Sequence, residues 1–182
     1  VAEGFESGGH NGREELTTMV LTALVARTVK IPVLAAGGIA TGRQMLAAFA
    51  LGAEGVQVGT RFALTQESSA HENFKKFCLQ VGWDATLLVL KKIIPVRMMK
   101  TPFFQKVVEA EARGASREEL LQLVGEGRPR RGMFEGDLEN GILEIGQTVA
   151  LINDLPTCAE VINSMVKEYE EARAGLPSLA AE

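Results

Sequence analysis

The feature that most limits the fold is a pair of short strand-like segments, each ended by glycine and joined by a helix-forming stretch. The first spans 31–36 and ends at Gly37-Gly38, and the second spans 55–58 and ends at Gly59. The first segment is apolar at every position, which is typical of a parallel sheet whose strands are buried on both faces. The order of strand, helix and strand with short links therefore predicts βαβ units.

The rest of the chain extends this unit in both directions. Residues 1–4 read as a strand and 16–28 as a helix, and one further strand is expected at 86–90. We therefore expect an α/β part at 1–79 and a mostly helical segment at 80–182 that packs on it. The other expected helices span 67–79, 95–113, 116–124 (capped by Ser116 with Glu119), 143–151 and 157–174, with a glycine- and arginine-rich connector at 125–136.

Composition excludes several classes of function. The net charge of −4 argues against a nucleic-acid surface, which needs a basic field, and no apolar run reaches the roughly 20 residues of a membrane span. The two cysteines, Cys78 and Cys158, lack metal or redox spacing and fit buried free thiols in a reducing compartment. We therefore expect a cytoplasmic protein with no metal site. Walker, GxSxG and dinucleotide GxGxxG motifs are absent from the sequence.

The two glycine loops follow neighbouring strands, so they should meet at the carboxyl edge of the sheet. In β/α barrels this edge carries the active site, and a phosphate commonly binds there. Glycine lets the backbone approach an anion, and free N–H groups at a helix start point at it. We interpret Gly37-Gly38 and Gly59-Thr60 as such a phosphate site, against the alternative of two ordinary turns. Arg61 either adds charge to the anion or forms only a salt bridge.

A histidine lies in a glycine-rich loop near the first strand. Gly8-Gly9 precede His10, and glycine is needed where the backbone approaches a ligand. A histidine in this place can act as a general acid or base near neutral pH. The alternative is a surface histidine without a role, and the residues alone leave both open.

Taken together, these segments resemble the nitronate monooxygenase (2-nitropropane dioxygenase) family, and the FMN-dependent trans-2-enoyl-acyl-carrier-protein reductase II shares the same motifs. The resemblance covers roughly positions 1 to 165 and is specific in order and spacing. It rests on EGFESGGHNG at 3–12, PVLAAGGI at 32–39, LGAEGVQVGTRF at 51–62, ESSAH at 67–71, and the GD and GQ pairs at 136–137 and 146–147.

The resemblance implies an FMN-binding TIM (β/α)8 barrel, of which this chain would supply the carboxyl-terminal portion, about the last three strands, followed by the helical segment. The start at Val1, inside a strand, fits a fragment. His10 matches the catalytic histidine of the family. Glu3 stands where many nitronate monooxygenases have a glutamine that contacts the flavin. The flavin-binding positions implied by the resemblance are Glu3, Gly8, Gly37, Gly38, Gln57, Val58, Gly59 and Thr60.

The function that this implies is the FMN-dependent oxidation of an alkyl nitronate with dioxygen. One alternative is NAD(P)H-dependent reduction of an enoyl thioester, and NAD(P)H is a cofactor only in that case. A second alternative is a non-catalytic piece or subunit of such a barrel. We expect a small-molecule substrate and no nucleic-acid or membrane partner, and the sequence leaves a homodimer open. We expect the 182 residues alone to bind FMN weakly and to be inactive, because three strands cannot close a barrel of eight.

Overall fold

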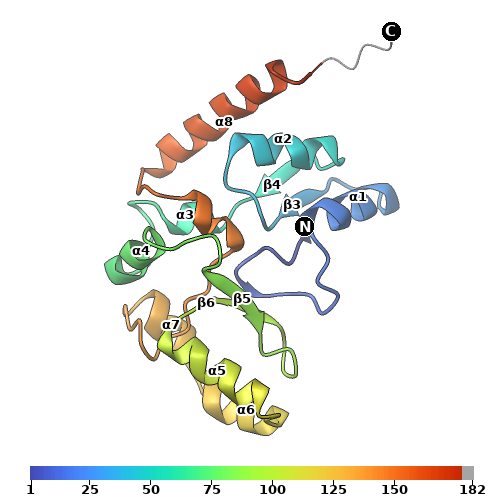
Figure 1. Ribbon diagram of the computed structural model, residues 1–182. Coiled ribbons are helices and arrows are strands. Elements are labelled where there is room, and N and C mark those ends of the chain that lie inside the picture. The colour runs from blue at the N-terminus through green and yellow to red at the C-terminus, as the bar shows by residue number, and fades with distance from the viewer. Residues whose placement is uncertain (178–182) are drawn as a thin grey trace.

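The computed structural model describes residues 1–177, and its first sheet is parallel. It contains β1 (Ala2–Glu3), β3 (Leu34–Ala36) and β4 (Gly55–Gln57) in the order β1-β3-β4 (Figure 1). Helices α1 (Thr18–Thr28) and α2 (Gly42–Ala50) connect these strands. The predicted βαβ order and the three predicted strands are thus confirmed, and the mixed α/β class with them.

A second, antiparallel sheet joins the start of the chain to its middle. It contains β2 (Gly9–His10), β6 (Val96–Met99) and β5 (Thr86–Val89) in the order β2-β6-β5. The strand expected at 86–90 is confirmed, but a helix from residue 95 is wrong. All four residues of β6 are buried, and pairing on both sides outweighs their helix-compatible sequence. The division of the chain at residue 79 stays a prediction.

The remaining elements are short helices, and most lie where the sequence indicates helix. Two predictions are wrong: the connector at 125–136 contains a helix, and residues 143–146 are not helical. Leu143 instead lies beside β6, where its carbonyl accepts a hydrogen bond from the Met99 N–H. The capping box of Ser116 with Glu119 is confirmed. These elements are α3 (Thr60–Ala63), α4 (Glu72–Cys78), α5 (Pro102–Ala112), α6 (Arg117–Val124), α7 (Arg128–Met133), the 3-10 helix η1 (Gln147–Leu151) and α8 (Cys158–Ala174).

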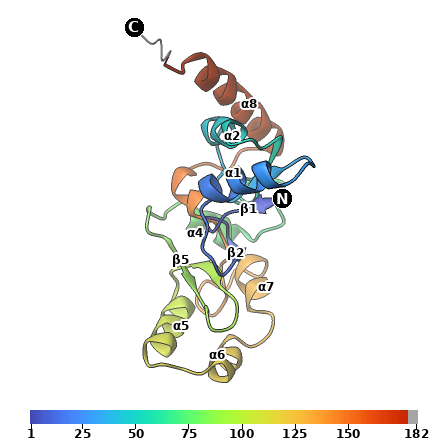
Figure 2. The ribbon, with the colours of Figure 1, turned by 90° about the vertical axis from the view of Figure 1, so that its right-hand side faces the viewer.

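The two sheets divide the molecule into an upper and a lower part (Figures 1 and 2). Helix α8 lies across α2 on the far side of the parallel sheet, and the two helices share a core with β3. Helices α5 and α6 pack against β5 and β6 at the opposite end. No helix within residues 1–177 is both long and apolar enough to cross a membrane.

The contact between α2 and α8 depends on a glycine. A Cβ atom at Gly42 would lie 2.2 Å from the Met165 carbonyl oxygen and 2.3 Å from the Tyr169 nitrogen. We expect Gly42→Ala to lower the free energy of unfolding by about 1–3 kcal/mol, because the two backbones must separate. Urea unfolding measures this, with Gly82→Ala as control, since its Cβ would meet only Asp84 Oδ1, at 3.5 Å. Equal unfolding midpoints for the two variants would contradict the prediction.

Candidate functional site

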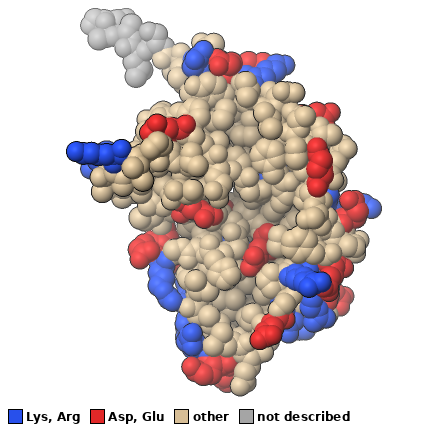
Figure 3. Space-filling view, turned by 180° about the vertical axis from the view of Figure 1, so that it is seen from behind, with Lys and Arg blue, Asp and Glu red and all other residues tan. Residues whose placement is uncertain are grey.

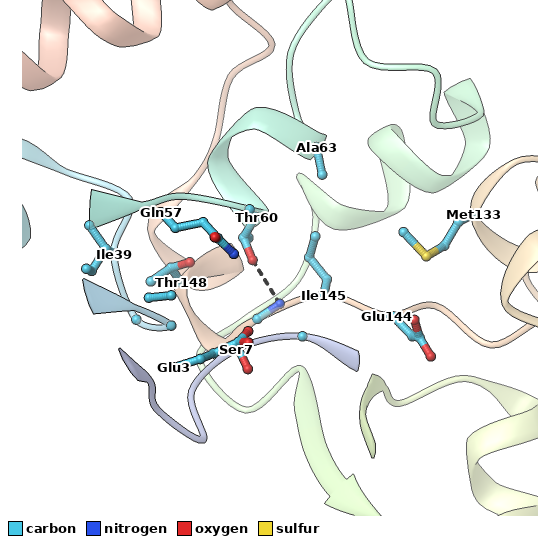
Figure 4. Close-up of a pocket in the computed structure, with 16 residues that line it drawn as sticks. Glu3, Ser7, Ile39, Gln57, Thr60, Ala63, Met133, Glu144, Ile145 and Thr148 are labelled. Carbon is cyan, nitrogen blue, oxygen red and sulfur yellow. Dashed lines mark hydrogen bonds between the residues drawn. The ribbon is translucent and has the colours of Figure 1, made fainter. Parts of the chain in front are cut away.

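A pocket of about 290 Å³ opens at the carboxyl ends of β3 and β4 (Figure 4). Its volume is at the lower end of the roughly 300–1,000 Å³ of small-molecule sites. Seven of the nine residues predicted from the sequence line it: Glu3, Gly8, Gly37, Gly38, Gln57, Gly59 and Thr60. The structure thus brings together segments that lie as much as 57 positions apart, from 3 to 60.

The loop after β3 requires glycine at two successive positions. Gly37 and Gly38 have φ angles of 82° and 72°, in the left-handed region that side chains avoid. A Cβ at Gly37 would lie 2.5 Å from the Gly4 carbonyl oxygen, and one at Gly38 would lie 2.8 Å from Glu6 Oε1. These glycines therefore form the loop itself, and a substitution would distort it before it affected any ligand.

The loop after β4 uses glycine differently. Gly59 has a φ of −97°, which any residue adopts, and no atom of residues 1–177 lies within 4 Å of the position that a Cβ would take there. The absence of a side chain at Gly59 therefore leaves open space beside the pocket. The next residue, Thr60, holds the opposite wall, because its hydroxyl accepts a hydrogen bond of 2.9 Å from the Gly146 N–H (Figure 4).

Backbone donors face this space. The N–H groups of Gly38, Ile39, Gly59 and Thr60 donate to no group within residues 1–177, and all four residues line the pocket. Backbone N–H groups that have no internal partner are available to an anion. The pocket lining among the described residues contains no lysine or arginine. An anion held here would therefore be bound by peptide dipoles and not by a cationic side chain.

Arg61 does not contribute its charge to the pocket. Its guanidinium is buried and turns away, with Nη1 donating to Asp154 Oδ1 at 2.6 Å and Nη2 donating to the Leu64 carbonyl at 2.7 Å. Of the two alternatives for this residue, the structure supports the salt bridge.

Two predicted site residues do not line the pocket. Val58 packs against the core between β3, α2 and α8, because side chains alternate between the faces of a strand. His10 is exposed on β2, at the edge of the second sheet. It lies close enough to Glu144 for its positive charge, when protonated, to lower the pKa of that carboxyl.

The segment 143–148 forms the wall that the sequence reading missed. Glu144, Ile145, Gly146 and Thr148 line the pocket together with Met133 of α7. A Cβ at Gly8 would lie 2.5 Å from the Ile145 carbonyl carbon, so this wall and the loop at Gly8 are in direct contact. The GQ pair at 146–147, which belongs to the family resemblance, could have indicated this wall. A helix was expected over 143–151, and that expectation did not predict which residues of the segment face the loop at Gly8.

A family model described as nitronate monooxygenase matches residues 1–168. The chain is 33% identical, over its whole length and 61% of the relative, to a (3aS,4S,5R,7aS)-5-hydroxy-7a-methyl-1-oxo-octahydro-1H-indene-4-carboxyl-CoA dehydrogenase of Rhodococcus jostii. It is 29% identical to the nitronate monooxygenase of Paraburkholderia phytofirmans, over 94% of this chain and 49% of that protein. The solved structure of FabK from Thermotoga maritima is 42% identical with a TM-score of 0.88, over 94% of this chain and 54% of that one.

This chain therefore spans about half to three fifths of the length of the relatives it matches. The superposition on FabK includes 94% of this chain. It is thus a likeness in fold and in sequence at once.

Proposed function

Because this chain belongs to the nitronate monooxygenase family, we propose that its pocket binds the phosphate end of FMN and that the intact protein containing it is an FMN-dependent oxidoreductase. The observation that carries this proposal is the group of four unpaired backbone N–H donors around open space at Gly59. A phosphate monoester is the anion that two adjoining glycine loops suit best. The residues present therefore fit the phosphate of a flavin nucleotide.

The side chains around these backbone donors are also suited to a flavin nucleotide. The Gln57 amide and the Glu3 carboxylate line the pocket and would offer polar groups to the ring system. Gly8 also lines the pocket, where it lies directly against Ile145. FMN, when bound, supplies the two-electron redox chemistry that no side chain of this site provides. His10, at the edge of β2, takes up or gives back a proton at the substrate carbon.

Oxidation of an alkyl nitronate with dioxygen is the first candidate reaction. It is supported by the family model, which matches 1–168, and by the nitronate monooxygenase of Paraburkholderia phytofirmans. In this reaction His10 would orient the nitronate, and it would act as the base that removes the α-proton only where the neutral nitroalkane is the substrate.

Reduction or oxidation of a thioester is the second candidate. FabK, at 42% identity, and a relative whose name specifies a carboxyl-CoA substrate support it. In the enoyl reductase reading, NAD(P)H provides the electrons and His10 protonates or positions the substrate.

A direct assay of the intact protein separates the two candidates. The protein is purified with its flavin and given either propyl-2-nitronate in air or an enoyl thioester with NAD(P)H. Oxygen uptake without NAD(P)H supports the first reaction, and NAD(P)H consumption that depends on the thioester supports the second. A protein that retains no flavin and acts on neither substrate would refute the proposed function.

The number of parallel strands leads to a separate prediction for the chain alone. The described residues place three strands in the parallel sheet, and a closed (β/α)8 barrel needs eight. We propose that they are the carboxyl-terminal strands of such a barrel, and that residues 1–182 alone bind FMN more weakly than micromolar. Quenching of flavin fluorescence on titration measures this, with the intact protein as control. A micromolar dissociation constant for the chain alone would contradict the prediction.

A further inference from the structure

Glu144 occupies the end of the pocket away from the glycine loops. In Figure 4 it lies beside Met133, whereas Ile39 and Gln57 lie at the other end. Its carboxylate packs over Gly9, the residue before His10, because a Cβ at Gly9 would lie 3.2 Å from Glu144 Oε2. The glycine loops bind phosphate in the proposed function, so Glu144 lies where the reacting part of a substrate would approach.

The charged side chains that line the pocket are all acidic. Glu3 and Glu144 are the acidic residues of the pocket lining, and no basic residue accompanies them among the described residues. Glu144 is half-buried, and this burial raises the pKa of its carboxyl above the ordinary value, while His10 opposes the rise. Burial also weakens solvent screening, so the charge on Glu144 acts strongly on anything bound beside it.

We propose that Glu144 is a specificity-determining residue, whose carboxylate disfavours substrates that are anionic at the reacting group and admits those that are neutral there. This inference rests on the proposed function, because it assumes that the substrate binds over the flavin ring at this end of the pocket. Of the two candidate reactions, it therefore favours the thioester reaction over the oxidation of free nitronates.

The expected size of the effect follows from electrostatics. A nitronate carries a full negative charge on the group that reacts, whereas an enoyl thioester is uncharged there. Two like charges about 6 Å apart at a partly screened site repel by enough to reduce binding about tenfold or more. Removing the charge on Glu144 should therefore strengthen the binding of nitronates and leave the binding of neutral thioesters almost unchanged.

The test compares Glu144→Gln with Glu139→Gln in the FMN-loaded intact protein at about pH 8. Glu139 is exposed, lies outside the pocket lining and loses the same charge, so it is a matched control. The probes are propyl-2-nitronate and the N-acetylcysteamine thioester of crotonic acid, which is neutral. We expect the ratio of kcat/KM for nitronate to that for thioester to rise about tenfold in Glu144→Gln and to stay constant in Glu139→Gln. Where only the thioester is turned over, the inverse of the nitronate's inhibition constant takes the place of its kcat/KM in this ratio. An unchanged ratio in Glu144→Gln would overturn the inference.

A second readout needs no flavin and no turnover. Burial raises the pKa of the Glu144 carboxyl in the folded state, so its ionisation destabilises the protein. This destabilisation is absent below the pKa of the unfolded state and becomes complete as the pH rises through the pKa of the folded state. Glu144→Gln should therefore raise the Tm at neutral pH and lose this advantage in acid. A Tm difference that is independent of pH would also overturn the inference. Loss of flavin or of all activity in the unaltered protein would instead count against the proposed function.

Discussion

Replacing His10 with glutamine is expected to lower kcat of the FMN-loaded intact protein by about 10²–10⁴-fold, the usual contribution of a general acid or base. Glutamine keeps the hydrogen-bonding capacity and the approximate size of imidazole but cannot exchange a proton. His10 lies on β2 with its backbone paired to Val96, so the substitution should leave the strand in place. Steady-state or stopped-flow kinetics with the substrate that the protein turns over measures the loss in kcat, and flavin absorbance measures how much cofactor the variant retains.

The other histidine provides the control. His71 caps α4 by accepting a hydrogen bond of 3.0 Å from the Asn73 N–H, and asparagine is a good residue at that position. His71→Asn should therefore keep both folding and turnover. If His10→Gln retains flavin and at least a tenth of the turnover, His10 is not the proton-transfer group. Since His10 is exposed and outside the pocket lining, its role requires a substrate that extends from the pocket past the edge of β2.

The parallel sheet could be predicted because its signals are local. Residues 31–36 are apolar throughout, glycine ends both strands, and the stretch between them has strong helix formers and a threonine cap at Thr41. Each of these features acts within a few positions of the chain. The sequence alone was therefore sufficient to predict the parallel sheet and the helices that connect its strands.

The second half differs because distant contacts decide its structure. Val96–Met99 becomes a strand because β2 pairs with it on one side and β5 on the other, and β2 is more than 80 positions earlier. Arg97 within it is buried and donates two hydrogen bonds to the Phe5 carbonyl. The secondary-structure propensity of a short segment does not predict such distant partners.

The candidate site divides in the same way. Its glycine loops were predictable, since spacing and resemblance both pointed to Gly37, Gly38 and Gly59. Met133 and Glu144 were not, because their segments reach the pocket only through tertiary packing, and the second was expected to be helical. The glycine loops of the proposed phosphate site could thus be predicted from the sequence, whereas the charge of Glu144 at the other end of the pocket could not.

The glycine after β4 gives the sharpest test of the phosphate site. We expect Gly59→Val to weaken FMN binding by the intact protein about 100-fold or more, because the side chain would enter the space that the phosphate needs. Losing two charge-assisted hydrogen bonds, at about 1.5–3 kcal/mol each, is sufficient for this effect. Fluorescence titration of the apoprotein with FMN measures the dissociation constant.

The fold itself should tolerate this change, and that separates Gly59 from its neighbours. A Cβ at Gly59 would meet no atom of residues 1–177 within 4 Å, and the φ at Gly59 is ordinary, so the Tm of the apoprotein should stay within a few degrees of the unaltered value. Gly38→Val, by contrast, combines a left-handed φ of 72° with a contact of 2.8 Å to Glu6 Oε1, and should lower both the Tm and the affinity. Gly82→Val controls for adding the same side chain to an exposed loop. If Gly59→Val binds FMN as tightly as Gly82→Val, the phosphate is not held between the two glycine loops, because the open space at Gly59 is then unused.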